Sequence, residues 1–278
     1  PASPPTGRSA SAPSTRAAEK PPPVWNRPLP IGADWAVKRG IDLPNPFGAS
    51  IFVVTLSRDI EVTDVRVTLP GGEPVTIGDL ATFAVGNETT LAAVKLDAWV
   101  LPLLNVYVLA GHTWTDSRLN LAVTIDRPLG DPVVLAATQD ASVGGPMIGG
   151  GASLVAGHGP WFVLVDANYN FSDVEGFEGG IGAWFASART GWSGPAGSGT
   201  WRAWVGAAWL RTDRTIRITQ ESPGLGTVLV EVDQRPVDPM TWQTGGSLGI
   251  GKRWDLMLEV GSNFDDAFLG IFSASYRF

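Results

Sequence analysis

Apolar and polar residues alternate one by one through most of the chain after residue 48, and no other feature constrains the fold as strongly. Residues 161–171, 201–209 and 254–261 each place large apolar side chains on one face and polar or small side chains on the other. Successive side chains of a β-strand point to opposite faces, so this pattern predicts two-faced strands. Because neither heptads nor alternating strands and helices are present, the sequence predicts an all-β fold.

In four alternating segments of the chain, two aromatic residues on the apolar face are eight residues apart. Eight residues rising ~3.3 Å each and tilted by about 40° span roughly 20 Å along a membrane normal. Outer-membrane barrels carry an apolar band about 25 Å tall with aromatic residues at both edges. The spacing therefore favours a transmembrane barrel, with these residues at the lipid interface. The pairs are Trp161 and Tyr169, Phe177 and Phe185, Trp201 and Trp209, and Phe268 and Tyr276.

The opposite face of the same segments mixes charged residues with many glycines. In the alternative, a soluble β-sandwich, the aromatic residues would be core residues spaced by chance. In a membrane barrel the apolar face meets lipid and the polar face lines a wet or plugged lumen. We therefore expect five charged residues to point into the lumen: Arg118, Asp166, Glu178, Arg202 and Glu259.

The final segment, from Phe268 to Phe278, also alternates and contains further aromatic residues. Its Phe272, Tyr276 and terminal Phe278 resemble the last-strand signature of Gram-negative outer-membrane β-barrel proteins. The resemblance implies an antiparallel up-and-down barrel in the outer membrane. It also implies that these three residues form the segment read by the barrel assembly machinery. The resemblance is to the superfamily, so no functional site comes with it.

Turn residues divide the chain into ten alternating segments, and residues 48–57 and 60–69 could supply two more. Bacterial single-chain barrels have even strand numbers, so we expect about twelve strands, with ten as the next count. A polar excursion at residues 212–240 is expected to form an extracellular loop containing a hairpin. The ten segments are 89–101, 104–115, 117–126, 147–156, 161–171, 177–189, 200–211, 241–252, 254–263 and 267–278.

Residues 1–47 form a separate compositional zone that contains half of the 22 prolines. Such a segment cannot build a core, so we expect an extended chain that acts as a plug, a spacer or a docking site for a partner. The barrel is expected to occupy residues 48–278. The uncharged stretch from Ala98 to Thr115 has the length of a membrane-spanning helix. Its alternating pattern and its proline argue against a helix there.

The composition excludes several kinds of chemistry. The chain has no cysteine, which removes disulfide frameworks and thiolate sites. Its net charge of −7 argues against a nucleic-acid partner. No metal-ligand or cofactor pattern is present, so we expect neither. Small outer-membrane barrels that hydrolyse lipids carry a serine two residues after the catalytic histidine, whereas His112 is followed by Thr113 and Trp114. Catalysis through His112 is therefore a weak alternative.

The sequence thus predicts a non-enzymatic outer-membrane barrel that passes a small solute through its lumen. A structural or assembly partner docking through residues 1–47 is the second hypothesis, and a lipid-modifying enzyme is the third. The expected partners are outer-membrane lipids, lipopolysaccharide and the assembly machinery. We expect the C-terminus, and the N-terminal segment with it, on the periplasmic side.

Overall fold

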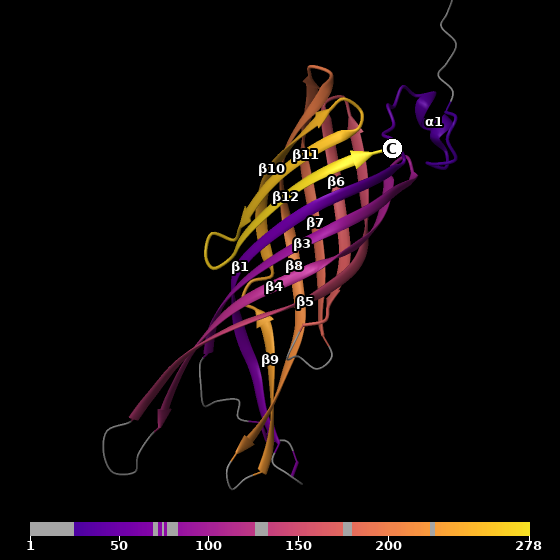
Figure 1. Cartoon of the computed structure of the whole chain (residues 1–278). Coiled ribbons are helices and arrows are strands. Elements are labelled where there is room, and N and C mark those ends of the chain that lie inside the picture. Colours follow the sequence, from indigo (N-terminus) through magenta and orange to yellow (C-terminus); the bar gives the residue numbers. More distant parts are fainter. Residues whose placement is uncertain are drawn as a thin grey trace, which may run out of the picture.

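A computed structural model describes residues 25–68, 72–73, 75–76, 83–125, 133–174, 180–222 and 226–278. Its strands form one antiparallel sheet, and ten of them close into an up-and-down barrel (Figure 1). The ring is completed where β1 pairs with β12 and where β8 pairs with β10. The ring strands are β1 (Phe47–Thr68), β3 (Phe83–Leu101), β4 (Leu104–Ile125), β5 (Val133–His158), β6 (Trp161–Ser172), β7 (Ile181–Ala196), β8 (Gly199–Ser222), β10 (Met240–Ile250), β11 (Trp254–Ser262) and β12 (Phe268–Arg277).

The ten-stranded ring is the second of the two strand counts that the sequence predicted. Residues 48–57 and 60–69 are one strand, β1, and residues 104–115 and 117–126 are one strand, β4. Polar residues at the junction of the two segments in each case resemble the residues of a turn, which is why the sequence predicted two strands. The structure instead continues the hydrogen-bond ladder through them, because these long strands extend beyond the apolar band into water. A transmembrane β-strand needs only about 9–11 residues, whereas β1 and β4 have 22 each.

The two ends of the barrel differ in their connections. At one end, here called the turn end, β3–β4, β5–β6, β7–β8 and β10–β11 are joined by two or three residues. Phe47 and Phe278 also lie there, with their rings stacked at 6.2 Å. The opposite end, the loop end, carries the longer connections. There the β4–β5 and β8–β9 hairpins extend as two separate prongs in the lower part of Figure 1.

Two strands lie outside the closed ring, both on extensions at the loop end. The two-residue β2 (Val75–Thr76) pairs with β1. The strand β9 (Gly226–Pro236) pairs with β8 on one side and with β1 on the other. It therefore bridges β8 and β1 beyond the ends of the short strands β10, β11 and β12. The hairpin expected within residues 212–240 is confirmed, because Thr215 pairs with Asp233.

Residues 25–46 lie at the turn end rather than inside the barrel. Their one helix is α1 (Ala33–Val37). A small buried cluster consists of Ala33 and Ala36 from this helix together with Leu43. The backbone amide of Ile31 donates to the carbonyl of Val100 beside the β3–β4 turn. None of these described residues lines the lumen cavity. The described part of the chain contains no helix with the length and apolar character needed to cross a membrane.

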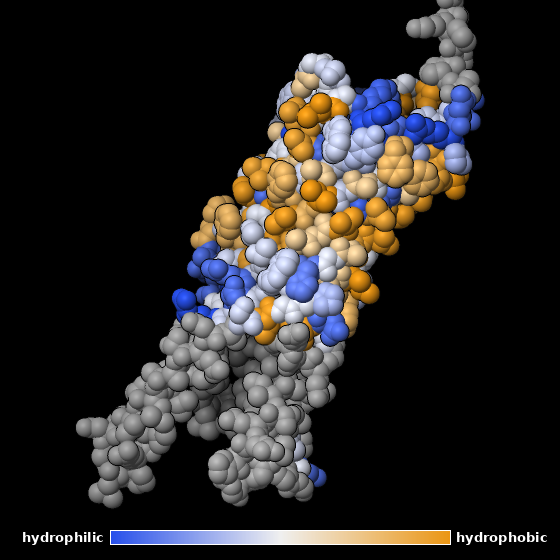
Figure 2. Space-filling model, viewed as in Figure 1, coloured by the Kyte–Doolittle hydropathy of each residue, from blue (hydrophilic) through white to orange (hydrophobic). Residues whose placement is uncertain are grey.

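The outer face of the barrel is apolar on every ring strand. On the face turned to the viewer, Figure 2 shows a broad apolar band with more polar residues above and below it. A monomeric soluble protein rarely exposes a continuous apolar surface of this extent, whereas lipid tails solvate it. Examples, all exposed, are Ile51 on β1, Leu96 on β3, Val108 on β4, Leu154 on β5, Val163 on β6, Trp184 on β7, Val205 on β8, Leu248 on β10, Leu258 on β11 and Phe272 on β12.

Aromatic residues lie on this outer face toward both ends of the barrel. On β6 and β7, Trp161 packs on Trp192 at 3.9 Å near the turn end, and Tyr169 packs on Trp184 at 5.0 Å nearer the loop end. Trp201 and Trp209 share the outer face of β8, as Phe268 and Tyr276 share that of β12. Three of the four pairs expected from the sequence therefore lie on the outer face.

The fourth expected pair is wrong at Phe185. This ring lines the lumen, while its neighbour Trp184 is 51% exposed on the outside. The outer face of β7 carries its own pair eight residues apart, Trp184 and Trp192, in the opposite phase of the strand. The expected choice of outward-facing residues on this strand was counted from Phe177, which lies outside the described residues. A phase inferred across a turn can shift by one residue, and such a shift reverses every side chain.

The phase of β7 can be tested with spin labels, because the chain has no native cysteine. In phosphatidylcholine vesicles, a nitroxide on the Trp184→Cys variant should show high oxygen accessibility, since oxygen concentrates in lipid. A nitroxide on Phe185→Cys should show low oxygen accessibility, since that position faces the lumen. The adjacent positions Val163 and Leu164 on β6 give a matched outer and inner pair. Equal oxygen accessibility at 184 and 185 would contradict the phase.

Candidate functional site in the lumen

The lumen contains a cavity of about 500 Å³ that is lined by side chains from all ten ring strands. Its lining extends from Trp99 and Arg277 near the turn end to Arg58 and Thr115 toward the loop end. Barrels of about eight strands are just wide enough for side chains to fill, and porins of 16–18 strands hold open channels. A ten-stranded ring therefore leaves a narrow space whose shape is set by individual side chains.

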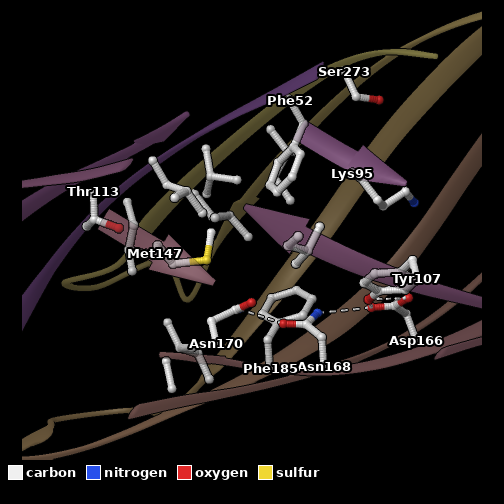
Figure 3. Close-up of a pocket in the computed structure, with 18 of the residues that line it drawn as sticks. Phe52, Lys95, Tyr107, Thr113, Met147, Asp166, Asn168, Asn170, Phe185 and Ser273 are labelled. Atoms are coloured by element: carbon white, nitrogen blue, oxygen red, sulfur yellow. Dashed lines mark hydrogen bonds between the residues drawn. The ribbon is translucent and has the colours of Figure 1, made fainter. Parts of the chain in front are cut away.

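The middle of the cavity is apolar, and we call its residues the apolar tier. Met147 on β5 is only 2% exposed, and it clusters with Leu109 and Tyr107 of β4 (Figure 3). This tier differs from the polar inner face that the alternation predicts for every strand. An uninterrupted apolar run at residues 51–54 was the signal, since such a run indicates a strand that is apolar on both faces. The apolar tier comprises Phe52, Leu91, Leu109, Met147, Phe185 and Ile271.

A ladder of polar side chains runs along the inner face of β6. Asp166 accepts hydrogen bonds from the Tyr107 hydroxyl to both carboxylate oxygens, at 2.9 and 3.0 Å. It also accepts bonds from the Ser153 hydroxyl at 2.5 Å and from the amide of Asn168 at 3.2 Å. The amide of Asn170 then donates to Asn168 at 2.7 Å. Figure 3 shows this ladder beside the apolar tier.

A buried ion pair occupies the lumen on the other side. Arg189 of β7 donates to both carboxylate oxygens of Glu259 on β11, at 2.7 and 2.9 Å. The indole of Trp204 on β8 donates to the same carboxylate at 2.5 Å. Glu259 is 1% exposed, so its charge depends on these three donated bonds. The pair reaches across β8 and β10, so no sequence pattern predicts that Arg189 pairs with Glu259.

Two further ion pairs lie near the turn end. Arg202 donates to Asp255 at 2.6 Å and to the hydroxyl of Ser247 at 3.1 Å. Arg277 donates to Asp97 at 2.9 Å, and the same carboxylate oxygen accepts a bond from the amide of Asn105 at 2.7 Å. The lumen charges at this end are therefore mostly neutralised in pairs. Such pairing is what a narrow, weakly hydrated space requires.

Lys95 lies in the same region with a different environment. Its ammonium group lies over the ring of Tyr107, 4.7 Å from the ring centre. Among the described residues it makes no hydrogen bond and no ion pair within 4.0 Å. Asp97 and Asp166 are within electrostatic range, but both already accept bonds from other side chains. Lys95 is thus a cation that faces the cavity without a bonded anion.

Glycines on the inner face make room for these polar contacts. Gly245 pairs across the sheet with Trp204 on one side and with Glu259 on the other. A Cβ atom at Gly245 would lie 2.8 Å from the Trp204 ring, so a larger residue would separate these partners. Gly48 lies in the same way between Arg277 and Asp97. The glycines therefore do not leave the lumen empty, because long side chains of the neighbouring strands lie over them.

The structure places three of the five expected lumen charges on the inner face: Asp166, Arg202 and Glu259. Glu178 lies outside the described residues. The prediction for Arg118 is wrong, because Arg118 is exposed on the outer face of β4. Odd-numbered residues of β4 from Asn105 to Thr115 face inward, as Tyr107 and Thr115 do. The outward polar side chain at 118 is tolerated because this part of β4 lies beyond the apolar band.

The weak catalytic alternative has little support in the geometry around His112. His112 lies on the outer face of β4, and its ring packs on Trp114 at 4.6 Å. It therefore does not face the lumen cavity. Within the described ranges, no cluster of three or more potential metal ligands is found.

Comparisons with known proteins give a low-similarity match to membrane barrels. No family model matches the chain, and no curated protein matches it in sequence. OprG from Pseudomonas aeruginosa is 13% identical, with a TM-score of 0.40 over 85% of this chain and 100% of that structure. The β-domain of the Bordetella autotransporter BrkA is 13% identical, with a TM-score of 0.35 over 83% and 100%. The Ralstonia pickettii toluene transporter TbuX is 13% identical, with a TM-score of 0.34 over 85% and 90%. At these values no activity carries over to this chain.

The class of the chain follows from its own structure. The ring is closed, every ring strand has an apolar outer face, and aromatic residues lie toward both ends of the outer surface. The fold is that of a bacterial outer-membrane β-barrel. A barrel of this class satisfies its backbone hydrogen bonds within the ring and so needs no polar groups toward lipid.

The burial of the Arg189–Glu259 ion pair predicts that truncating Glu259 lowers the free energy of unfolding far more than truncating the exposed Lys252. Glu259→Ala should lower the free energy of unfolding by about 3–5 kcal/mol, because it leaves Arg189 buried without a counter-charge. Replacing both partners, as Arg189→Met with Glu259→Leu, should cost less than Glu259→Ala alone. Lys252→Ala, which removes a surface pair with Asp42 at an 81% exposed side chain, should leave stability unchanged. Guanidinium unfolding in lipid vesicles measures all three, and equal losses for Glu259→Ala and Lys252→Ala would contradict the assignment.

The inner glycine beside this pair gives a second prediction. Gly245→Val should destabilise the barrel by about 1–3 kcal/mol, because the new side chain displaces Trp204 from Glu259. Its neighbour Gly246 faces outward, so Gly246→Val is a matched control that should have a much smaller effect. Gly245→Val and Glu259→Ala should combine less than additively, since both disrupt one contact. Additive losses in the same unfolding assay would show that the glycine acts independently.

Proposed function

We propose that this barrel is an outer-membrane channel that passes small solutes through its lumen. The single observation that carries the proposal is the cavity that runs along the lumen between the two ends and receives side chains from every ring strand. Its volume, about 500 Å³, lies within the range of about 300–1,000 Å³ that is typical for small-molecule sites. The passage is narrow, so its substrates are small.

The lining of the cavity supports a solute with both polar and apolar parts. Charges at the turn end lie mostly in ion pairs, while the apolar tier occupies the middle and hydroxyl groups line the loop end. A bare inorganic ion would lose hydration in the apolar tier without gaining bonds there. A solute with an apolar portion would gain from contact with the same side chains.

Orientation in the membrane is part of the proposal. Bacterial barrels carry short turns on the periplasmic side and longer loops outside. We therefore assign the turn end, with residues 25–46, to the periplasm and the loop end to the cell exterior, facing lipopolysaccharide. Phe272 and Tyr276 on the outer face of β12, together with Phe278, are proposed as the segment that the assembly machinery binds.

Blocking the middle of the lumen tests the channel. Met147→Trp should lower single-channel conductance in planar bilayers about twofold or more, because a close-packed tier cannot absorb the larger ring. Val163→Trp places the same side chain on the outer face of β6 and should leave conductance unchanged. Far-UV circular dichroism and the gel mobility of heated and unheated samples would show that both variants fold.

Two outcomes would overturn the channel. One is a folded parent barrel that shows no conductance, which would make docking of a partner through the N-terminal segment the next hypothesis. The other is an equal conductance in the parent and in Met147→Trp, which would show that the current does not pass through the apolar tier.

A further inference from the structure

We propose that the lumen contains an anion site at Lys95 that binds the carboxylate of a small amphiphile, whose apolar tail lies along the apolar tier. The proposal rests on the channel function proposed above and deepens it, because it names the class of solute. It combines three features: a cation without a bonded anion, neighbouring hydroxyl donors, and an apolar space of suitable size.

The first feature is the unmatched charge of Lys95. Three arginines of the same region each contact a carboxylate, whereas the described residues offer Lys95 only the face of the Tyr107 ring. The nearby carboxylates of Asp97 and Asp166 bond to other side chains rather than to Lys95. Asp97 accepts bonds from Arg277 and Asn105, and Asp166 accepts four bonds on its two oxygens. A ligand carboxylate would supply the missing partner.

The second feature is a row of hydroxyl groups next to Lys95. Ser50 of β1 pairs directly with Lys95 of β3 on one side and with Ser275 of β12 on the other. The Ser50 hydroxyl donates to Ser275 at 2.8 Å, and both residues line the cavity. Directly opposed side chains in a sheet have Cβ atoms about 4.5–5.5 Å apart. One carboxylate can therefore accept a bond from Lys95 and a bond from a serine of this row.

The third feature is the direction in which the apolar tier begins. Phe52 follows Ser50 on the inner face of β1, one inward position closer to the loop end, and it pairs with the buried Ala93 of β3. Leu91 pairs with Val54, the next inward residue of β1. Figure 3 shows Lys95 beside Tyr107 and Asp166 on one side of the cavity, with Phe52 and Phe185 between them and Met147. A ligand with its carboxylate at Lys95 would thus extend its tail past Phe52 toward Met147.

A second cavity-lining cation, Arg58, is less suited to this role. Its side chain is 5% exposed, and its Nε and Nη1 atoms have no hydrogen-bond partner among the described residues. The carboxylates of Asp266 and Asp238 are both within electrostatic range of it. These two carboxylates repel an incoming anion, whereas near Lys95 the positive charges of Arg277 and Arg189 lie within electrostatic range and offset those of Asp97 and Asp166.

Octanoate is the probe for the experiment, with the full chain reconstituted in phosphatidylcholine nanodiscs and equilibrium dialysis of the labelled acid. Empty nanodiscs give the blank for partition into lipid. We expect saturable binding that Lys95→Gln weakens about tenfold or more, as expected for loss of a charged hydrogen bond. Lys95→Arg should restore binding, since it retains the cation. Lys252→Gln, a surface control, should bind as the parent does.

Octanol separates the headgroup from the tail. It has the same chain length without the charge, so its weaker binding should be the same in the parent and in Lys95→Gln. Circular dichroism and heat-dependent gel mobility of Lys95→Gln would establish that the variant is folded. Equal octanoate affinity in the parent and a folded Lys95→Gln would overturn the anion site, as would an absence of saturable octanoate binding to the parent.

The binding and conductance experiments test the anion site and the channel independently of each other. A barrel that binds octanoate through Lys95 but shows no conductance would support the anion site and refute the channel. A barrel whose conductance falls in Met147→Trp but which binds no octanoate would support the channel and overturn the anion site.

Discussion

Closure of the ring between β1 and β12 is the constraint on which the rest of this structure depends. The two strands pair from Gly48 with Arg277 to Ser57 with Phe268. A lipid environment offers no water to the backbone, so an open sheet edge within the apolar band would leave amide and carbonyl groups without partners. Once the ring is closed, each side chain faces either lipid or lumen. The strict alternation of the sequence follows from these two environments.

The narrow ring then determines what the lumen can hold. Charged residues that face inward in ten strands lie close enough to meet across two or three strands, as Arg189 meets Glu259. A charge there is stable when it is paired, and inner glycines such as Gly245 provide the space for that pairing. The result is a lumen with charge pairs toward the turn end and an apolar tier in the middle. This division of the lining is the physical basis of the selectivity proposed above.

Long strands explain most of the differences between the expected and observed fold. Arg58 and Asp59 in β1, like Asp116 and Ser117 in β4, are polar residues within continuous strands. In a soluble protein such residues often mark a turn, so the sequence suggested two strands in each case. In this barrel the strands extend beyond lipid, where polar outward side chains such as Arg118 carry no cost. Whether such a polar stretch is a turn or part of a continuous strand depends on where the membrane lies along the strand, and the local sequence pattern does not show this.

The sequence by itself determined the all-β class, the alternation of environments and the outer aromatic residues of β6, β8 and β12, because these are local properties of period-two strands. Tertiary structure alone decided the phase of β7, where Trp184 rather than Phe185 faces lipid, and the arginine partners of Glu259 and Asp97. These arginines lie 70 and 180 residues away in the chain and meet the carboxylates only through the register of strands in a closed ring. The apolar tier has the same origin. Only when the ring closes does one face of each strand become the lumen face, and on strands that are apolar on both faces local alternation does not show which face that is.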